Sequence, residues 1–304
     1  MHPRDAARLL MLAGLWGGSF AFIRVAAPAL GPLWLAFARV SIAFLALFAL
    51  ALVRRSLPPF RSHWRSLAII GVVNSVLPFT LFAFAEQYVG ASTAAILNAT
   101  SPFFAAIVSA LWLHDPFTRF KLAGMALGLA GVTLLVGWQP EPATSGAMLA
   151  ILACLAAALC YAVASCYVKR YLRDVSSEAV ALYSQFTAAV ALGPALLFVP
   201  MPAWPSSLVV GNVLALALGS TAIAYLLYFR LIESIGPARA LTVTFLIPLF
   251  GVLWGALFLG EAPTWNTFAG CALILSGTWI ATRDRSGLQT SSAAGPRTCA
   301  RSSR

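Results

Sequence analysis

Long apolar runs alternate with short polar breaks along nearly the whole chain. A helix needs about 20 apolar residues to cross the hydrocarbon core of a bilayer. Runs of about that length lie near 9–27, 33–53, 67–88, 92–113, 120–138, 146–169, 178–199, 208–231, 237–259 and 265–282. Breakers such as Pro58-Pro59 and the segment 200–205 separate them. The pattern predicts an all-α integral membrane protein with ten transmembrane helices.

Positive charge gathers on one side of this predicted arrangement. Of the 20 Lys and Arg residues, 18 lie at the two termini or in alternate connections between the runs. The remaining two, Arg24 and Arg39, lie inside runs. Short cytoplasmic loops of membrane proteins carry such an excess of Lys and Arg. We therefore expect a multi-pass protein whose N- and C-termini are both cytoplasmic.

The composition supports the membrane interpretation. Hydrophobic residues make up 61% of the chain and charged residues 10%, whereas soluble domains carry about 25% charged residues. The net charge of +11 is scattered over loops and termini, which suits a rim facing anionic lipid and argues against nucleic acid as a partner. The five cysteines form no CxxC pair, and nothing predicts a metal or a cofactor. Residues 284–304 are predicted to form a disordered cytoplasmic tail.

The chain also repeats itself at an offset of 146 residues. Residues 88–132 align with 234–278 without a gap, with 14 identities in 45 positions. The informative matches pair Gly90 with Gly236, Pro102 with Pro248, Thr118 with Thr264, Gly124 with Gly270 and Gly131 with Gly277, and further upstream Phe82 with Tyr228 and Asn74 with Ser220. Each half, 1–143 and 144–283, holds five predicted spans, so equivalent spans run in opposite directions. Two inverted five-helix repeats (5+5) are typical of secondary transporters, whose substrate site lies near the midplane.

Several short motifs follow one another along the chain. They are Trp16-Gly17-Gly18-Ser19-Phe20 followed by Arg24, then Phe37-Ala38-Arg39, then Pro102, Leu113, Asp115, Thr118 and Gly124, and finally Pro248, Leu259-Gly260-Glu261, Thr264 and Gly270. Residues 8–282 thereby resemble the ten-span EamA-type branch of the drug/metabolite transporter (DMT) superfamily. The chain departs from that pattern at Arg24, where Lys is usual, at Asp115, where Glu is usual, and in the order of Phe37 and Arg39. The resemblance implies a small-molecule transporter of a bacterial inner membrane, with a central cavity lined by spans 1, 3, 4, 6, 8 and 9.

Prolines and small polar residues inside the spans are candidates for the cavity wall. Pro102 and Pro248 are expected in the middle of the fourth and ninth spans, and Pro78 lies in the third. A proline frees a carbonyl and kinks a helix, either to shape a cavity or simply to pack. The polar candidates are Asn74, Asn98, Ser101 and Thr244. They line the cavity or join neighbouring helices by hydrogen bonds.

Aromatic residues form the second group of candidates. They are Trp16, Phe20, Phe79, Phe82, Tyr161, Tyr225 and Tyr228. Phe79 with Phe82, and Tyr225 with Tyr228, are spaced by three residues and share a helix face. Such rings line a cavity for an apolar or aromatic substrate, or they pack against lipid or core.

Arg24, Arg39 and Glu86 are candidates for a gate or a structural ion pair. An ionisable residue inside a membrane points to function by default. Arg24 is expected to snorkel or to gate. For Arg39 we favour a structural pair with Glu86 over a pair with a substrate carboxylate.

The acidic residues lie in loops or near span ends. Because proton-coupled carriers commonly use buried carboxylates or histidines, we expect facilitated or exchange-like transport with weak pH dependence. The predicted substrates are small neutral or zwitterionic metabolites, in particular amino acids including aromatic ones, moved outwards by alternating access. Efflux of apolar drugs or quaternary cations is the alternative. A membrane-embedded enzyme is disfavoured, since no nucleophile–base or metal set is evident. The glycines of the fifth span favour internal packing and a monomer over a dimer.

Overall fold

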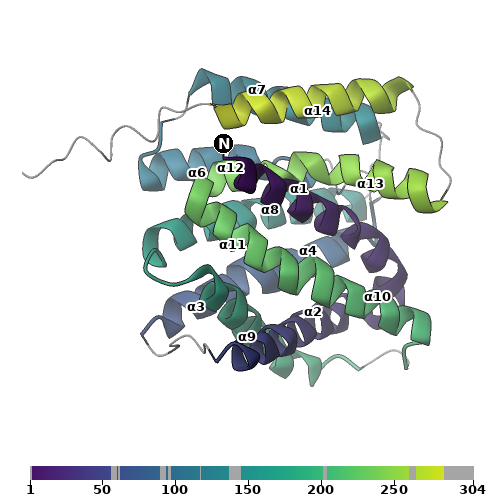
Figure 1. Ribbon diagram of the computed structural model, residues 1–304. Helices are drawn as coiled ribbons and strands as arrows, with labels where there is room; N and C mark the ends of the chain where they lie inside the picture. Colours follow the sequence, from purple (N-terminus) through teal and green to yellow (C-terminus); the bar gives the residue numbers. More distant parts are fainter. Residues whose placement is uncertain are drawn as a thin grey trace, which may run out of the picture.

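The computed structural model describes residues 2–55, 60, 62–89, 94, 97–116, 118–136, 145–200, 204–259 and 265–283. The predicted tail at 284–304 lies outside these residues. Within them every element is a helix, and no strand is present. The helices pack into a bundle in which α7 and α14 lie side by side along one edge and α2 and α9 lie at the other (Figure 1).

The order of the helices is as follows. The first half contains α1 (Pro3–Gly17), α2 (Ser19–Val53), α3 (Trp64–Gly71), η1 (Val72–Val76), α4 (Leu77–Ala85), α6 (Ser101–Leu113) and α7 (Arg119–Val136). The second half contains α8 (Ser145–Tyr171), α9 (Ser177–Leu196), α10 (Ser207–Ala217), η2 (Leu218–Ile223), α11 (Ala224–Ile235), α12 (Pro237–Ala240), α13 (Val243–Leu259) and α14 (Trp265–Arg283). Here η marks a π-helix. The halves interlock, because α2 packs on both α9 and α10, and α1 packs on α13.

Five helical segments are long and apolar enough to cross a membrane by length and composition alone. They are Val25–Val53, Trp64–Ala85, Ser145–Tyr171, Ser177–Leu196 and Ser207–Ile235. Shorter apolar helices cover Ser101–Leu113, Pro237–Phe250 and Phe268–Ala281. Large apolar side chains such as Leu111 and Phe198 are exposed on the outside. Such a surface is unfavourable in water and favourable against lipid tails, so the chain is a multi-pass membrane protein.

Prolines and one glycine determine where several helices bend or begin. The long helix α2 is interrupted at Gly31, whose φ of 75° and ψ of 161° are not helical, and Pro28 and Pro32 flank it. This break separates the runs predicted at 9–27 and 33–53. Pro248 lies inside α13, as expected. Pro102 lies in the first turn of α6, which begins at Ser101 after a turn at residues 99–100. A proline there needs no N–H partner, so Pro102 starts a helix instead of kinking one.

The two π-helices stand at equivalent places in the two halves. Residues 72–76 of η1 correspond to 218–222 of η2 at the repeat offset of 146 residues. A π-helix replaces i→i+4 with i→i+5 hydrogen bonds and is often found at functional sites. The local change in pairing leaves main-chain carbonyls available to neighbouring helices. Apolar periodicity does not predict this feature, since a π-turn keeps the same residue types as an α-turn.

Glycines bring α7 and α14 into direct backbone contact. A Cβ atom on Gly124 would lie 2.5 Å from the nitrogen of Ala281 and 2.6 Å from the oxygen of Gly277. A Cβ atom on Gly131 would lie 2.7 Å from the nitrogen of Ile274. Only glycine fits at such distances. The glycines of the fifth predicted span therefore pack against the tenth within the same chain.

Candidate substrate cavity

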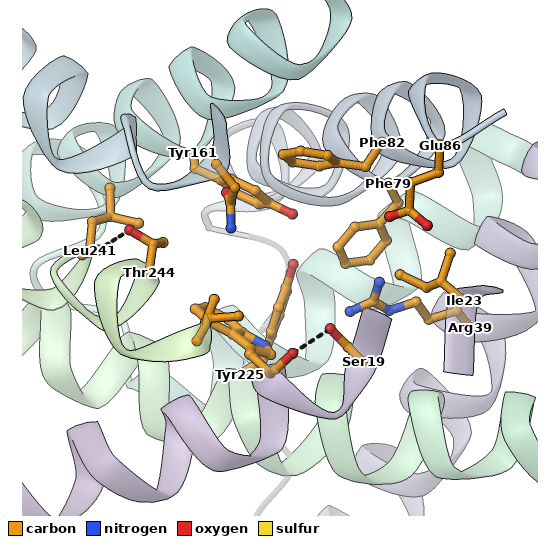
Figure 2. Close-up of a pocket in the computed structure, with 13 residues that line it drawn as sticks. Ser19, Ile23, Arg39, Phe79, Phe82, Glu86, Tyr161, Tyr225, Leu241 and Thr244 are labelled. Carbon is orange, nitrogen blue, oxygen red and sulfur yellow. Dashed lines mark hydrogen bonds between the residues drawn. The ribbon is translucent and has the colours of Figure 1, made fainter. Parts of the chain in front are cut away.

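A cavity lies among helices drawn from both halves of the chain. It holds about 640 Å³ of empty space, part of which opens to solvent. Its lining consists of Trp16, Ser19, Ile23, Arg39, Phe79, Phe82, Glu86, Asn98, Tyr161, Tyr225, Leu241, Thr244 and Ile247. Figure 2 shows Arg39, Glu86 and Ile23 at one end, Leu241 and Thr244 at the other, and Tyr161 facing Tyr225 across the middle.

Many of the residues singled out from the sequence meet in this lining. They are Trp16, Arg39, Phe79, Phe82, Glu86, Asn98, Tyr161, Tyr225 and Thr244. Others lie elsewhere in the bundle, namely Asn74, Pro78, Ser101, Pro102, Tyr228 and Pro248. The side chains of Phe20 and Arg24 are outside what the structure describes. Whether the lining residues bind substrate stays a prediction.

The sequence did not single out four lining residues. Ser19 belongs to the motif that begins at Trp16, and its hydroxyl donates to the Trp16 carbonyl at 2.6 Å. Its place in that motif was the only feature of the sequence that could have identified Ser19 as a lining residue. Ile23, Leu241 and Ile247 are apolar residues among many others. No pattern separates an aliphatic residue that faces a cavity from one that faces lipid.

Aromatic rings form most of the cavity wall and its support. Phe82 and Tyr161 are stacked, with ring centroids 6.3 Å apart and planes at 21°. Trp16 lies against Tyr228 at 5.3 Å, and Tyr228 is fully buried behind it. Such ring pairs add stabilisation beyond the area they bury. The wall is therefore well packed and offers flat apolar faces to a ligand.

The two π-helices hold aromatic residues of the wall through equivalent main-chain carbonyls. The Ser220 carbonyl in η2 accepts a hydrogen bond from Trp16 Nε1 at 3.0 Å. The Asn74 carbonyl in η1 accepts one from the Tyr225 hydroxyl at 3.0 Å. Trp16 belongs to the first half and Ser220 to the second, whereas Tyr225 belongs to the second half and Asn74 to the first. Each half thus orients a ring of the other.

The hydrogen bonds of the polar candidates are mainly local. Ser101 donates to the Asn98 carbonyl at 2.7 Å, and Thr244 donates to the Leu241 carbonyl at 2.9 Å. These bonds hold the chain where the fourth and ninth predicted spans are interrupted. The Asn74 side chain is fully buried and has no hydrogen-bond partner among the described residues.

Arg39 is buried, with 7% of its surface exposed. Its Nε donates to the Thr221 hydroxyl at 2.6 Å, and its Nη2 lies 3.4 Å from the Ser220 carbonyl. Its guanidinium carbon lies 3.7 Å from the centre of the Phe79 ring, a favourable cation–π contact. Arg39 and Glu86 both line the cavity, and the structural ion pair between them that the sequence favours stays a prediction.

Away from the cavity, a cluster of charges joins the two halves. Glu178 at the start of α9 lies 2.6 Å from Arg230 of α11 and 3.5 Å from Arg54 at the end of α2. All three side chains are partly exposed. Among the described residues, no group of three or more His, Cys, Asp or Glu side chains could hold a metal ion.

The bundle, its two matching π-helices and a cavity between the halves define a helical membrane transporter. The model of the EamA-like transporter family matches residues 6–137 and again 148–283. The chain belongs to the EamA-like transporter family, and so to the DMT superfamily.

Relatives and a solved structure agree with this assignment. An S-adenosylmethionine/S-adenosylhomocysteine transporter of Chlamydia trachomatis serovar L2 is 30% identical over 285 residues, which cover 88% of this chain and 87% of that one. An uncharacterized transporter of Archaeoglobus fulgidus is 26% identical over 286 residues, covering 91% and 98%. A solved crystal structure has a TM-score of 0.76 at 20% identity, covering 93% of this chain and 98% of that chain. The similarity to this solved structure supports the fold alone.

Proposed function

We propose that the chain is an alternating-access carrier for small zwitterionic metabolites, in particular amino acids with apolar or aromatic side chains. The observation that carries the proposal is the lining of the cavity. Aromatic rings form its middle, while Arg39 and Glu86 supply opposite charges at one end. Ligand sites are mostly apolar, with a few polar groups that fix orientation. This lining suits a compact molecule with an apolar body and a doubly charged head.

The proposed topology has ten crossings in two inverted repeats, 1–143 and 144–283. Residues 3–30, in α1 and the first part of α2, make the first crossing, and the rest of α2 makes the second. The segment α3–η1–α4 and its equivalent α10–η2–α11 are the third and eighth crossings. The fourth and ninth are interrupted helices that end in α6 and α13, as expected for half-helices around a transporter site. The remaining crossings are α7, α8, α9 and α14.

The one-sided charge supports cytoplasmic termini in an inner membrane. With this orientation, the Glu178 cluster lies at the cytoplasmic end, and Glu86 lies towards the outside.

The relative from Chlamydia trachomatis, named as an S-adenosylmethionine/S-adenosylhomocysteine transporter, supports substrates with an amino-acid head. S-Adenosylmethionine and S-adenosylhomocysteine each carry an α-amino-acid head and a flat adenine ring. These features match the charged end and the aromatic middle of the cavity. The presence of Arg39 in the lining works against the alternative of quaternary cations that carry no carboxylate, because like charges repel in a site of low dielectric constant. We propose efflux by a monomer, facilitated or exchange-like.

The test is uptake by liposomes that contain the purified protein, at equal pH inside and outside. The labelled probes are L-phenylalanine, L-tryptophan, L-leucine and S-adenosyl-L-homocysteine, with tetraethylammonium for the alternative. Saturable uptake of an amino-acid probe, suppressed by an excess of the unlabelled compound, is the expected result. Uptake of tetraethylammonium alone, or no uptake above that of empty liposomes, would contradict the proposal.

A further inference from the structure

The two π-helices make different hydrogen bonds to the helices that pack on them. α1 packs on η2, and α8 packs on η1. The Ser220 hydroxyl of η2 donates a hydrogen bond to the Leu15 carbonyl of α1 at 2.6 Å. At the repeat offset of 146 residues, Asn74 of η1 corresponds to Ser220, and Tyr161 of α8 corresponds to Leu15. The Asn74 side chain has no hydrogen-bond partner among the described residues, so the equivalent bond is not formed.

The local hydrogen bonds of the two packing helices are alike. Ser19, just after α1, donates to the Trp16 carbonyl at 2.6 Å. Ser165 of α8 donates to the Ala162 carbonyl at 2.9 Å. Each bond spans three residues, and the two pairs are related by the same offset of 146 residues. The offset therefore relates the structures of these segments as well as their sequences.

A second pair of contacts on the π-helices is formed in both halves. Arg39 Nε of α2 donates to the Thr221 hydroxyl of η2 at 2.6 Å, and Gln185 Nε2 of α9 donates to the Ser75 hydroxyl of η1 at 3.2 Å. The donors are 146 residues apart, and so are the acceptors. The halves thus agree where α2 and α9 meet the π-helices. They differ where α1 and α8 meet them.

The Asn74 side chain is fully buried, and neither its oxygen nor its nitrogen has a partner among the described residues. An amide carries two donors and one acceptor, and buried polar groups of native proteins are nearly always paired. Leaving this amide unpaired therefore destabilises the described state. A second state in which the amide is paired accounts for its presence. The bond from Ser220 to Leu15 indicates the partner, which is the Tyr161 carbonyl.

Both contacts act on main chain that carries a ring of the cavity wall. Tyr161 lines the cavity and stacks on Phe82. Leu15 directly precedes Trp16, which also lines the cavity. A hydrogen bond to the Tyr161 carbonyl would fix the main chain at the base of its ring, and release of the Leu15 carbonyl would free the base of the other. Exchange of the two bonds therefore changes the shape of the wall (Figure 2).

We propose that Asn74 and Ser220 form an alternating latch. In the described state, Ser220 holds α1 on η2 through the Leu15 carbonyl. In the opposite state of the carrier, Asn74 donates to the Tyr161 carbonyl and holds α8 on η1, while Ser220 releases Leu15. The latch sets the balance between the two states. This inference rests on the proposed alternating access, but it does not depend on the identity of the substrate.

The experiment compares access to the cavity from the two sides of the membrane. Thr244 of the lining is replaced by cysteine, and a membrane-impermeant thiol reagent is applied to right-side-out and to inverted vesicles. The ratio of the two labelling rates reports the balance of the two states, and no substrate is needed. The background is the same protein without the added cysteine.

Three variants test the latch. Asn74→Leu removes the amide at similar size, and Ser220→Ala removes the hydroxyl that binds Leu15. Asn74→Ser installs the residue that the other half uses at the equivalent position. The matched control is Asn212→Leu in α10, because the Asn212 side chain donates to the Leu208 carbonyl of its own helix.

We expect Asn74→Leu and Ser220→Ala to shift the labelling ratio in opposite directions. Asn74→Leu removes the bond of the opposite state, whereas Ser220→Ala removes the bond of the described state. Each shift should be about two- to tenfold, the effect of one hydrogen bond on an equilibrium. Asn74→Ser keeps a hydroxyl donor, so its ratio should stay closer to the wild-type ratio than that of Asn74→Leu. The control should leave the ratio unchanged.

Shifts in the same direction, or no shift in either variant, would overturn the latch. An amide that only binds a buried water molecule predicts a change of Tm in Asn74→Leu without any change of the ratio. If the leucine variant does not fold, Asn74→Ala removes the same amide without adding bulk and must shift the ratio against Ser220→Ala.

The outcome for the proposed function is separate. Labelling from both sides that neither Asn74→Leu nor Ser220→Ala shifts would refute the latch and leave the carrier standing. Labelling from one side only, in the wild-type background and in every variant, would refute alternating access together with the latch.

Discussion

The Tyr225 hydroxyl donates a hydrogen bond to the main-chain carbonyl of Asn74, 3.0 Å away, and this bond joins α11 of the second half to π-helix η1 of the first. The hydroxyl also lies 3.4 Å from Ser75 Oγ, which accepts from Gln185. Tyr225 is 1% exposed. The bond therefore fixes a ring of the cavity wall with respect to a buried polar network.

Tyr225→Phe keeps the ring and removes the donor. The Asn74 carbonyl would then be buried without this partner, and we expect a loss of about 0.5–1.5 kcal/mol of stability. Thermal unfolding in detergent measures the loss. Tyr171→Phe, at an exposed tyrosine, should leave Tm unchanged. If both variants unfold at the wild-type temperature, the hydrogen bond contributes nothing to holding the halves together.

The contact between α7 and α14 is expected to be intolerant of any side chain at Gly124. Gly124→Ala would place a methyl group 2.5 Å from the Ala281 nitrogen, so the helices must separate and lose their close packing. We expect Tm to fall, with a destabilisation of about 1–3 kcal/mol, as is typical of overpacking. Gly211→Ala in α10 is the matched control, since a Cβ atom on Gly211 would meet nothing within 4 Å. An equal response of both variants would contradict a packing role for Gly124.

The Glu178 cluster is expected to act on conformation more than on stability. Its side chains are 40–55% exposed, and exposed ion pairs contribute about 0–1 kcal/mol. Glu178→Gln weakens the link of α9 to both Arg54 and Arg230, so the end of the bundle where these residues meet should open more often. A cysteine placed at Leu226, which lines the small pocket beside Glu178, should then react faster with a thiol reagent.

The background for that measurement is the same Glu178→Gln protein without the added cysteine. Asp174→Asn, at an exposed acid close to the start of α9, removes the same charge outside the cluster and should leave the labelling rate unchanged. If Glu178→Gln also leaves that rate unchanged, the cluster does not restrain the opening of this end.

The sequence predicted those features that depend on hydropathy, charge and repetition. The apolar runs predicted the helices, and the break between the first two runs falls at Gly31 of α2. The motif at Trp16 and the aromatic pair Phe79 and Phe82 pointed to residues that meet in one lining. The sequence did not show that Pro102 lies in the first turn of α6, because a proline that starts a helix and one that kinks a helix look alike within an apolar run.

The remaining features depend on relations across the bundle. The partners of the Asn74 and Ser220 carbonyls and of Arg39 are residues about 150–200 positions away along the chain. One-dimensional periodicity carries no information about them. Arg39 and Gln185 are 146 residues apart in the sequence, but only the structure shows that each donates to a hydroxyl of a π-helix, Arg39 to Thr221 and Gln185 to Ser75. The same holds for Glu86, which follows the end of α4 and still lines the cavity.

Transport is expected to respond only weakly to a proton gradient, and Glu86 is where this expectation is tested. Proton-coupled carriers need a buried group that gains and loses a proton during the cycle. Among the described residues, Glu86 is the one carboxylate of the lining, and no histidine belongs to it. If Glu86 keeps its charge throughout the transport cycle, it carries no proton across the membrane. An inward proton gradient imposed on liposomes should therefore change the initial rate of L-phenylalanine uptake less than about twofold. Accumulation driven by the gradient, and abolished in Glu86→Gln while exchange at equal pH persists, would instead make Glu86 the proton carrier.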